Sequence, residues 1–323
     1  MRIVFLDVLT VADLTTELAR FADLGTFVSY ETTPAGQTVD RLAGATVAIT
    51  NKVVLGRAEL DQLPDLRLIC IAATGTNNVD LAAAAERGIP VRNVAGYSTE
   101  SVAQHTFGLL FALLGDLAHL NDAVYDGTYT RHPAFAYWRR PFPEIAGKRW
   151  GVIGLGTIGR RVAELATAFG AEVVYHSTSG RNTTGQPYPH LSLTDLLSTS
   201  DVITLHCPLN EQTTDLLGAD ELRQLKPTAC LINVARGGVV NETALVNALN
   251  AGHLAGAAAD VFTTEPLPAD HPYLRIEDRS RLLLTPHVAW ASIAARKTLL
   301  AAVYQHIHNY LHDGDPAPEG CLT

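Results

Sequence analysis

Arg-Trp-Gly-Val-Ile-Gly-Leu-Gly-Thr-Ile-Gly, from Arg149 to Gly159, is the stretch that decides how this chain is read. Trp150 to Ile153 is a short apolar run typical of a buried parallel strand. A glycine-rich turn follows, and Arg160 to Phe169 then carries apolar residues at helical intervals. Strand, glycine turn and helix in this order are the context that a dinucleotide-binding fingerprint requires.

The glycines of this turn stand in G-x-G-x-x-G spacing, and each has a physical role. Gly154 permits a tight turn, Gly156 lets the backbone approach a pyrophosphate, and Gly159 lets helix and strand pack closely. The helix N-terminus offers free N–H groups to the phosphates. The alternative is a glycine-rich turn without a ligand, but the flanking strand and helix favour the dinucleotide. We therefore expect cofactor contacts from Gly154, Gly156, Thr157, Ile158 and Gly159.

The composition is typical of a soluble protein with large cores. The 323 residues, of which 47% are hydrophobic, are enough for about two domains. The formal net charge of -9 argues against a nucleic-acid partner, which would need a basic face. No apolar run reaches the roughly 18 residues of a membrane span. The N-terminus reads as a first strand and not as a signal peptide. We expect a cytoplasmic protein that binds neither nucleic acid nor membrane.

The cysteines show no C-x-x-C pairing, and neither they nor the histidines predict a disulfide or a metal site. Three of the four cysteines lie in or beside apolar runs, which favours buried thiols: Cys70, Cys207 and Cys230. His306, His308 and His312 have a metal-like spacing on a terminal helix, but no acid or thiol cluster lies nearby. We expect these histidines on a solvated helix face and predict no metal site.

Short apolar runs alternate with helical patterns along the whole chain. The strands predicted before the fingerprint are Arg2–Leu6, Thr26–Tyr30, Ala45–Ile49, Leu68–Ala72 and Val91–Asn93. Those predicted after it are Glu172–His176, Val202–His206, Ala229–Val234, Ala255–Phe262 and Leu282–Thr285. Such alternation with short loops predicts an α/β fold with parallel sheets covered on both faces. A long helix is expected from Ser98 to about Leu120, and the last helix from Ile293 to Leu311.

Three charged side chains follow three of these strands. Arg236, Glu265 and His287 each come just beyond a strand end, where doubly wound sheets bind ligands. An arginine suits a planar carboxylate, because its fork bonds both oxygens. A histidine suits proton transfer to a carbonyl near neutral pH, and a glutamate beside it stabilises the imidazolium. Alone, each residue has an ordinary alternative: a surface salt bridge, a solvated loop acid or a histidine after a turn. Together they predict one active site.

These residues carry a resemblance to the D-isomer-specific 2-hydroxyacid dehydrogenase family, closest to its glycerate dehydrogenase or hydroxypyruvate reductase branch. The resemblance covers nearly the whole chain. Besides the fingerprint and the three charged segments, the matching pieces are Asn51-Lys52, Ala73–Asp80, Gly96–Thr106, His206–Leu209 and Thr285–Trp290.

The resemblance implies roles for individual residues. Arg236, Glu265 and His287 would be catalytic, and Asp260 would be the acid near the nicotinamide. The implied substrate-binding residues are Asn51, Lys52, Thr74, Gly75, Arg236 and Trp290, with backbone N–H groups at Thr74 and Gly75 holding the carboxylate. The further implied cofactor contacts are Val102, His206, Cys207, Pro208, Thr213, Val234, Ala235, Asp260, His287 and Ala289. For Lys52, a plain surface lysine is an equal alternative.

The resemblance also implies the domain plan and the reaction. A flavodoxin-like catalytic domain would consist of residues 1–100 and 288–323, with a Rossmann cofactor domain of residues 101–287 inserted between them. A homodimer would form largely through the cofactor domain. NAD(P)H would reduce C2 of a small 2-keto acid to the D-2-hydroxy acid, with hydroxypyruvate or glyoxylate favoured, giving D-glycerate or glycolate.

The second strand after the fingerprint ends without an acidic residue. A fingerprint that prefers NAD usually has an acid on the ribose about 20 residues further on. Here Ser177, Thr178 and Arg181 follow the strand. Small hydroxyls and an arginine suit a 2′-phosphate, so NADP(H) is the favoured cofactor. NAD(H) is the alternative, with Arg181 in solvent and a water in place of the carboxylate.

Two other functions fit the same fold. A non-enzymatic dinucleotide sensor resembling the transcriptional corepressors shares the architecture, but the acidic balance fits no DNA role. A phosphite dehydrogenase of this fold is the second alternative. Formate enzymes of the family carry glutamine where Glu265 stands, which argues against formate.

Overall fold

The computed structural model describes residues 1–312, which form two compact units. Unit 1 consists of Met1–Ser98 and the chain from Ser292 onward, and unit 2 of Thr99–Ala291. The sequence predicts domain boundaries between residues 100 and 101 and between residues 287 and 288. In the structure the chain passes from unit 1 to unit 2 between residues 98 and 99 and returns between residues 291 and 292. Cys321, the fourth cysteine, lies outside the described residues.

Unit 1 contains a five-stranded parallel sheet in the order β2-β1-β3-β4-β5. Its strands are β1 Arg2–Phe5, β2 Thr26–Ser29, β3 Val47–Thr50, β4 Leu68–Ile71 and β5 Val91–Arg92. This order is that of flavodoxin-like sheets, as the resemblance implies. Two of the three interior strands, β3 and β4, are buried at every residue, which explains why they are continuous apolar runs.

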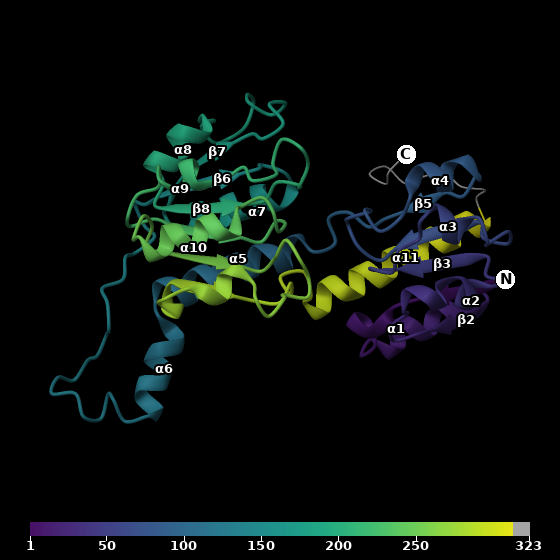
Figure 1. Cartoon of the computed structure of the whole chain (residues 1–323), viewed down its shortest axis with the longest axis horizontal. Helices are drawn as coiled ribbons and strands as arrows, with labels where there is room; N and C mark the ends of the chain where they lie inside the picture. Colours follow the sequence, from purple (N-terminus) through teal and green to yellow (C-terminus); the bar gives the residue numbers. More distant parts are fainter. Residues whose placement is uncertain (313–323) are drawn as a thin grey trace. The chain divides into compact units, whose positions relative to one another are not determined.

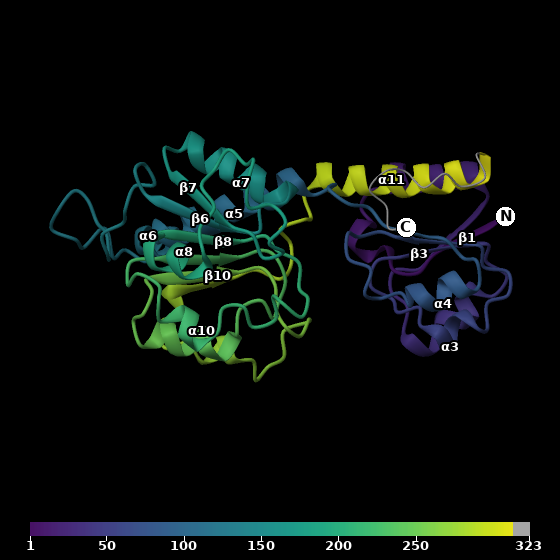
Figure 2. The same ribbon diagram turned by 90° about the horizontal axis from the view of Figure 1, so that it is seen from above.

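Helices cover both faces of this sheet. They are α1 Thr15–Ala19, α2 Thr38–Leu42, α3 Arg57–Leu60, α4 Leu81–Glu86 and α11 Ile293–His312. Figure 2 shows α11 on one face and α3 and α4 on the other. The α11 helix, from the far end of the chain, packs against β4 and completes the core of unit 1.

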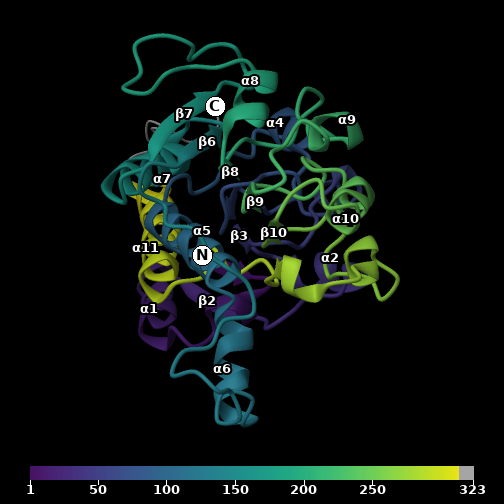
Figure 3. The same ribbon diagram turned by 90° about the vertical axis from the view of Figure 1, so that its left-hand side faces the viewer.

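Unit 2 contains a six-stranded parallel sheet in the order β11-β10-β9-β8-β6-β7 (Figure 3). Its strands are β6 Arg149–Ile153, β7 Glu172–His176, β8 Val202–Leu205, β9 Cys230–Asn233, β10 Gly256–Ala259 and β11 Leu282–Leu284. An isolated parallel bridge from His190 to Tyr175 lies where a further strand would flank β7. With that bridge as the third strand, the order becomes 3-2-1-4-5-6 plus one edge strand, which is the Rossmann order. The predicted α/β fold with its Rossmann domain is confirmed.

Two helical layers enclose the sheet of unit 2. The helices of these layers are α5 Thr99–Leu114, α7 Thr157–Ala168, α8 Leu193–Thr199, α9 Ala219–Leu222 and α10 Glu242–Asn250. The other helix of unit 2, α6 Leu117–Tyr125, lies away from the sheet (Figure 1). Side chains of α5 and α7 share one core with Val152, and side chains of α8, α9 and α10 share another with Ile153. The alternation of neighbouring strand residues between two cores follows from the pleat of the strand.

Side-chain caps fix where several helices begin. The carboxylate of Asp80 accepts the N–H of Ala83, which starts α4, and Asn241 caps α10 in the same way. Such caps stabilise a helix by about 1 kcal/mol. Short 3-10 helices complete the structure: Val8–Val11, Arg20–Leu24, Ala35–Gln37, Pro272–Arg275 and Arg279–Arg281.

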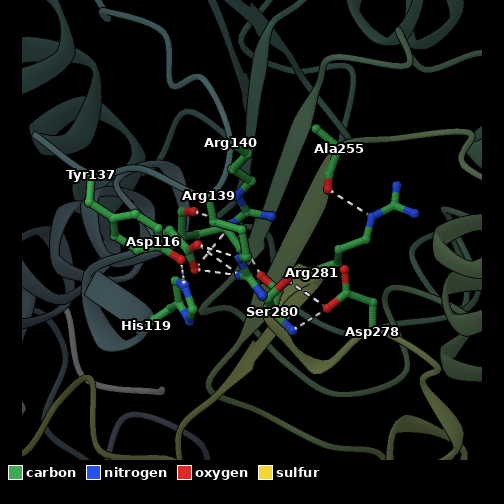
Figure 4. A network of polar contacts seen from close by, with 10 residues as sticks. Asp116, His119, Tyr137, Arg139, Arg140, Ala255, Asp278, Ser280 and Arg281 are labelled. Carbon is green, nitrogen blue, oxygen red and sulfur yellow. Dashed lines mark hydrogen bonds and ion pairs between the residues drawn. The ribbon is translucent and has the colours of Figure 1, made fainter. Parts of the chain in front are cut away.

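The long helix predicted from Ser98 to Leu120 is wrong, because it breaks after Leu114. Asp116 takes a left-handed φ of 51°, and α5 and α6 meet at 56°. Arg139 holds the break by donating from Nε and Nη2 to the two carboxylate oxygens of Asp116, at 2.9 and 2.8 Å (Figure 4). In the same network His119 Nε2 lies 3.1 Å from the hydroxyl of Tyr137. Residues 116–145 thus form an arm that leaves the sheet of unit 2 (Figure 1).

Three further expectations can be compared with the structure. Cys70, Cys207 and Cys230 are buried, as predicted. The solvated face predicted for the histidines of α11 is wrong for His306, which is half-buried with Nε2 3.1 Å from the carbonyl oxygen of Asn93. Within residues 1–312, no single helix is long and apolar enough to cross a membrane. Only α5 and α6 taken together, across their bend, pass that test of length and composition.

Candidate functional site

The turn after β6 has no room for a side chain at two of its glycine positions. Gly154 has a φ of 92°, and a Cβ on it would lie 2.8 Å from the backbone nitrogen of Cys207. A Cβ on Gly159 would lie 2.1 Å from the carbonyl oxygen of Gly154. Both glycines are therefore required for the protein to pack against itself. Gly156 differs, because a Cβ there would meet nothing within 4 Å and its φ is -81°.

Nothing inside the protein requires glycine at position 156. Gly156 is the exposed N-cap of α7 and makes no side-chain cap bond. The first N–H groups of a helix have no partner within the helix, and an open N-terminus of this kind suits a pyrophosphate. Thr157 is exposed at the start of α7, and Ile158 packs against the core below it. These residues fit a dinucleotide.

The other predicted cofactor residues of unit 2 follow its strands. They come directly after a strand end: Ser177 after β7, His206 after β8, Val234 after β9 and Asp260 after β10. Because every pair of neighbouring strands is parallel, these ends share one edge of the sheet, which we call the carboxyl rim. Val102 instead lies on α5, where it is buried in the core.

No acid follows β7 on the carboxyl rim. The strand ends at His176, whose Nδ1 lies 3.1 Å from the carbonyl oxygen of Leu191. Ser177 is buried, Thr178 is half-buried and Arg181 is exposed. Hydroxyl side chains therefore follow β7 where a ribose-binding carboxylate would otherwise stand.

The segment after β8 is held by its own hydrogen bonds. The buried Thr213 hydroxyl donates to the carbonyl oxygen of Pro208 at 2.7 Å and accepts the N–H of Asn210 at 2.8 Å. Burial lowers the pKa of His206 to about 3, so its imidazole is neutral, and burial raises the pKa of the Cys207 thiol to about 11. Thr213 shapes this loop, and neither His206 nor Cys207 carries charge near neutral pH.

Glu265 and His287 lie in contact on the carboxyl rim. His287 Nδ1 is 2.7 Å from Oε2 of Glu265, and Oε1 of Glu265 accepts the N–H of Phe262 at 3.0 Å. His287 has a left-handed φ of 54°, and its carbonyl oxygen accepts the indole N–H of Trp290 at 2.9 Å. With Nδ1 engaged by the carboxylate, Nε2 is the ring nitrogen left for a substrate.

Arg236 reaches the same edge from the end of β9. Its neighbour Gly237 packs so closely on the loop of Glu265 that a Cβ would lie 1.9 Å from the carbonyl carbon of Phe262. Within residues 1–312, the exposed Arg236 side chain donates only to the carbonyl oxygen of Ala235, at 2.8 Å, and forms no ion pair. The surface salt bridge considered for this arginine is therefore absent there, and the guanidinium has donors for an anion.

Asp260 supports the loop that carries His287. It is fully buried, and its carboxylate accepts the N–H of Val288 at 2.9 Å and of Ala289 at 2.8 Å. Burial raises the pKa of Asp260, but hydrogen bonds from His105, Thr285 and the two N–H groups lower it further, below its usual value. Asp260 is thus a buried anion that fixes backbone.

In unit 1, the predicted substrate residues follow β3 and β4. The carboxylate of Asp7 accepts the N–H of Asn51 at 2.8 Å and of Lys52 at 2.6 Å, so it shapes this loop. Burial raises the pKa of Asp7, partly offset by these bonds. The Asn51 side chain donates to the hydroxyl of Thr10 at 3.2 Å. Asp7 was not identified from the sequence, although an acid directly after the first strand is a usable signal.

The loop after β4 is tied to the next strand. The Thr74 hydroxyl donates to the carbonyl oxygen of Val94 at 3.0 Å, and the Asn93 side chain donates to that of Thr74 at 2.7 Å. Thr74 is exposed and Gly75 half-buried. Since β3 and β4 are parallel neighbours, the Asn51-Lys52 and Thr74-Gly75 loops lie at one edge of the unit 1 sheet.

Two residues of α5 that sequence reasoning did not assign also touch the carboxyl rim. The Ser101 hydroxyl donates to the carbonyl oxygen of Ala289 at 2.6 Å, and His105 Nε2 lies 3.1 Å from the hydroxyl of Thr285. They stand four apart on a helix that reads as apolar core, which hides them from a periodicity argument.

Comparisons with known proteins agree with this geometry. Residues 107–289 match the family model described as D-isomer specific 2-hydroxyacid dehydrogenase, NAD binding domain. The chain is 42% identical to a putative 2-hydroxyacid dehydrogenase of Haemophilus influenzae, covering 96% of this chain and 98% of that protein. It is 40% identical to a glycerate dehydrogenase of Methylorubrum extorquens, covering 88% and 89%.

A solved structure is similar over the whole chain. The NADPH-dependent glyoxylate/hydroxypyruvate reductase of Sinorhizobium meliloti, in complex with NADP and malonate, superposes with a TM-score of 0.84 at 28% identity. The match covers 100% of this chain and 96% of that one.

Proposed function

The chain belongs to the D-isomer-specific 2-hydroxyacid dehydrogenase family and is an NAD(P)-dependent oxidoreductase, and we propose that it reduces a small 2-keto acid to its D-2-hydroxy acid. Hydroxypyruvate, giving D-glycerate, and glyoxylate, giving glycolate, are the favoured substrates. The glycerate dehydrogenase of Methylorubrum extorquens and the reductase of Sinorhizobium meliloti act, by their names, on such acids.

One observation carries the proposal. A glutamate and a histidine form a 2.7 Å contact on the carboxyl rim that also holds the dinucleotide fingerprint and an arginine without an ion pair in the described chain. Imidazole, carboxylate and guanidinium are the groups that reduction of a 2-keto acid needs, for proton delivery, for charge compensation and for carboxylate binding.

Each of the three side chains has a separate task in the proposed reaction. A bound nicotinamide cofactor supplies the hydride to C2. Arg236 bonds the substrate carboxylate and polarises the keto oxygen. His287 delivers the proton from Nε2 to the developing alkoxide, and in the oxidative direction accepts it. Glu265 stabilises the protonated imidazole through Nδ1.

Residues of unit 1 complete the assignment of substrate contacts. We assign the backbone N–H groups of Thr74 and Gly75 to the substrate carboxylate, and Asn51 and Lys52 to its hydroxylated end. The bonds from Asp7 to the Asn51-Lys52 backbone preorganise that loop. We assign the remaining contact to Trp290, whose indole is anchored on His287.

We propose NADP(H) as the preferred cofactor. Its 2′-phosphate would bind Ser177, Thr178 and Arg181, where no acid follows β7. The test compares the Michaelis constants of NADPH and NADH for the wild type and for Arg181→Gln. We expect Arg181→Gln to weaken NADPH alone. A strong preference of the wild type for NADH would refute this choice of cofactor and leave the reaction unchanged.

We further propose a homodimer that forms through unit 2. The arm carries exposed apolar side chains: Leu117, Val124, Tyr125, Phe135, Trp138 and Phe142. At its base, a cavity of about 670 Å³ lies beside Pro141, Phe142 and Ile145, and it reaches the starts of β8, β9 and β10. A second copy of unit 2 would cover these apolar side chains, since soluble monomers rarely expose large contiguous apolar patches. Light scattering gives the mass, and Tyr125→Ser with Phe135→Ser should lower it to that of one chain.

A cytoplasmic location is part of the proposal. The buried Cys207 and Cys230 form no disulfide within residues 1–312, as expected in a reducing compartment. Cell fractionation of the producing organism tests it, and recovery outside the cytoplasm would refute it.

A panel of substrates tests the function itself. Hydroxypyruvate, glyoxylate and phosphite are each assayed with both cofactors, by the change in nicotinamide absorbance. Turnover of a 2-keto acid with D stereochemistry in the product supports the proposal. Turnover of phosphite alone would indicate the alternative enzyme, and tight cofactor binding without any turnover would indicate a dinucleotide sensor.

A further inference from the structure

One face of α5 grips the loop that carries His287. Ser101 and His105 are one helical turn apart, so their side chains lie on the same face. The Ser101 hydroxyl donates at 2.6 Å to the carbonyl oxygen of Ala289, two residues after His287 in the chain. His105 Nε2 lies 3.1 Å from the hydroxyl of Thr285, two residues before His287 in the chain.

The contacts of Asp260 determine which atom donates in the hydrogen bonds between His105, Thr285 and Asp260. The Thr285 hydroxyl is 2.6 Å from Oδ1 of Asp260, and a buried carboxylate of lowered pKa can only accept there. The single hydroxyl proton of Thr285 is therefore given to Asp260. Since that proton is used, the Thr285 oxygen accepts from His105, and Nε2 of His105 carries a proton. His105 Nε2 is also 3.5 Å from Oδ1 of Asp260.

Asp260 connects His105 and Thr285 to the backbone next to His287, the proposed proton donor. Its two oxygens accept the N–H groups of Val288 and Ala289, the residues directly after His287. His287 itself holds a left-handed φ of 54°, which costs energy in a residue with a side chain. The neighbouring bonds must therefore keep the loop in this conformation.

We propose that Ser101 and His105 are positioning residues that hold the loop of His287. This rests on the proposed function, in which His287 delivers the proton. We call these two residues and their contacts the clamp. Ser101 fixes Ala289 directly, and His105 orders the carboxylate of Asp260 through Thr285. Neither residue contacts the reacting atoms. Their effect is to keep the imidazole in the one orientation that its contact with Glu265 requires.

The clamp also lies beside both chain crossings between the units. The chain enters unit 2 between Ser98 and Thr99 and leaves it between Ala291 and Ser292. The bond from Ser101 to Ala289 joins these two ends of unit 2. The first turn of α5 and the loop of the proton donor are thereby held as one piece.

The test compares two substitutions of His105 in the full-length protein. His105→Leu removes the donor, whereas the amide of His105→Gln can still donate to Thr285. We expect His105→Leu to lower kcat about 10- to 100-fold with the cofactor Kd nearly unchanged, since small misplacements of a reacting group cost this much. His105→Gln should recover most of the rate. Ser101→Ala should lower kcat as well, and the double variant should lose less than the product of both losses.

Amide hydrogen exchange supplies a readout that is independent of turnover. In His105→Leu, the amides of Val288 and Ala289 should exchange faster than in the wild type, because Asp260 is less well ordered. His253→Leu is the matched control, since His253 precedes β10 at the opposite edge of the sheet, and it should change neither rate nor exchange.

Three results would overturn the clamp: a kcat of His105→Leu within about twofold of the wild type, equal losses in His105→Leu and His105→Gln, or unchanged exchange at Val288 and Ala289. If the wild type reduces no 2-keto acid, the proposed function fails. The exchange measurement then decides alone whether the clamp exists.

Discussion

Nδ1 of His287 lies 2.7 Å from Oε2 of Glu265, across loops that are 22 residues apart in the chain. The contact exists because β10 and β11 are parallel neighbours whose ends lie side by side. The left-handed backbone of His287 is held on one side by the Glu265 contact and on the other by Asp260 beneath Val288 and Ala289. The imidazole is thus oriented by two carboxylates with different tasks.

Glu265→Gln should slow the reaction without weakening the cofactor. The amide keeps the size of the side chain but no longer stabilises the imidazolium, so we expect kcat to fall about 10- to 100-fold. Steady-state kinetics with hydroxypyruvate measures it. Glu172→Gln, at the start of β7 on the opposite edge, is the control and should behave as the wild type. A Glu265→Gln enzyme of unchanged kcat would mean that the carboxylate only shapes the loop.

Arg236→Lys should raise the KM of the keto acid about tenfold or more, because lysine keeps the charge and loses the two-pronged geometry. Arg236→Gln should lose more, since it removes the charge as well. Arg223→Lys provides the comparison, because Arg223 pairs with Asp220 on the surface of α9. Wild-type KM and kcat in Arg236→Lys would argue against bidentate carboxylate binding.

Two alanine substitutions separate packing from ligand binding in the fingerprint. Gly159→Ala places a Cβ 2.1 Å from a backbone oxygen, so the free energy of unfolding should fall by about 1–3 kcal/mol. Gly156→Ala meets no protein atom, so its thermal midpoint should stay close to that of the wild type. Its cofactor Kd should nevertheless rise about tenfold, a loss near 1.4 kcal/mol. An unchanged Kd for Gly156→Ala would mean that no pyrophosphate lies there.

Asp260→Asn should reveal a pH-dependent part of the stability. The folded-state pKa of Asp260 is lowered, so its contribution is fully present above the unfolded pKa and is lost as the pH falls through the folded value. We expect Asp260→Asn to be about 2–3 kcal/mol less stable at pH 7, and the difference to shrink below about pH 4. Denaturant unfolding at several pH values measures it. A difference that grows on acidification would contradict the lowered pKa, and exposed Asp220→Asn should show no such trend.

Most of the fold could be predicted from the sequence, because strands buried on both faces are continuous apolar runs. The broken helix could not. Leu114 and Leu117 continue a helical pattern across the break, and the residue that holds Asp116 in its left-handed turn, Arg139, lies 23 positions later. Local patterns carry no information about such a contact. β10 is also shorter than expected, because its apolar run continues into the loop that follows Asp260.

The candidate site shows the same division. Arg236, Glu265 and His287 could be predicted from the sequence because each follows a predicted strand, and parallel strands end at a common edge of the sheet. The supporting residues were not found in this way. Asp7 looks like an ordinary acid after a strand, and Ser101 and His105 look like polar interruptions of a core helix. Their functions depend on which atoms of distant residues the folded chain places opposite them.

The proposed reaction depends above all on His287 as the proton donor. The most direct measurement is the kcat of His287→Gln for reduction of the preferred keto acid, together with the cofactor Kd of the same protein. We expect kcat to fall at least about a thousandfold, within the range for loss of a general acid, while the Kd stays that of the wild type. A His287→Gln enzyme that keeps kcat within about tenfold of the wild type would contradict the proposed mechanism.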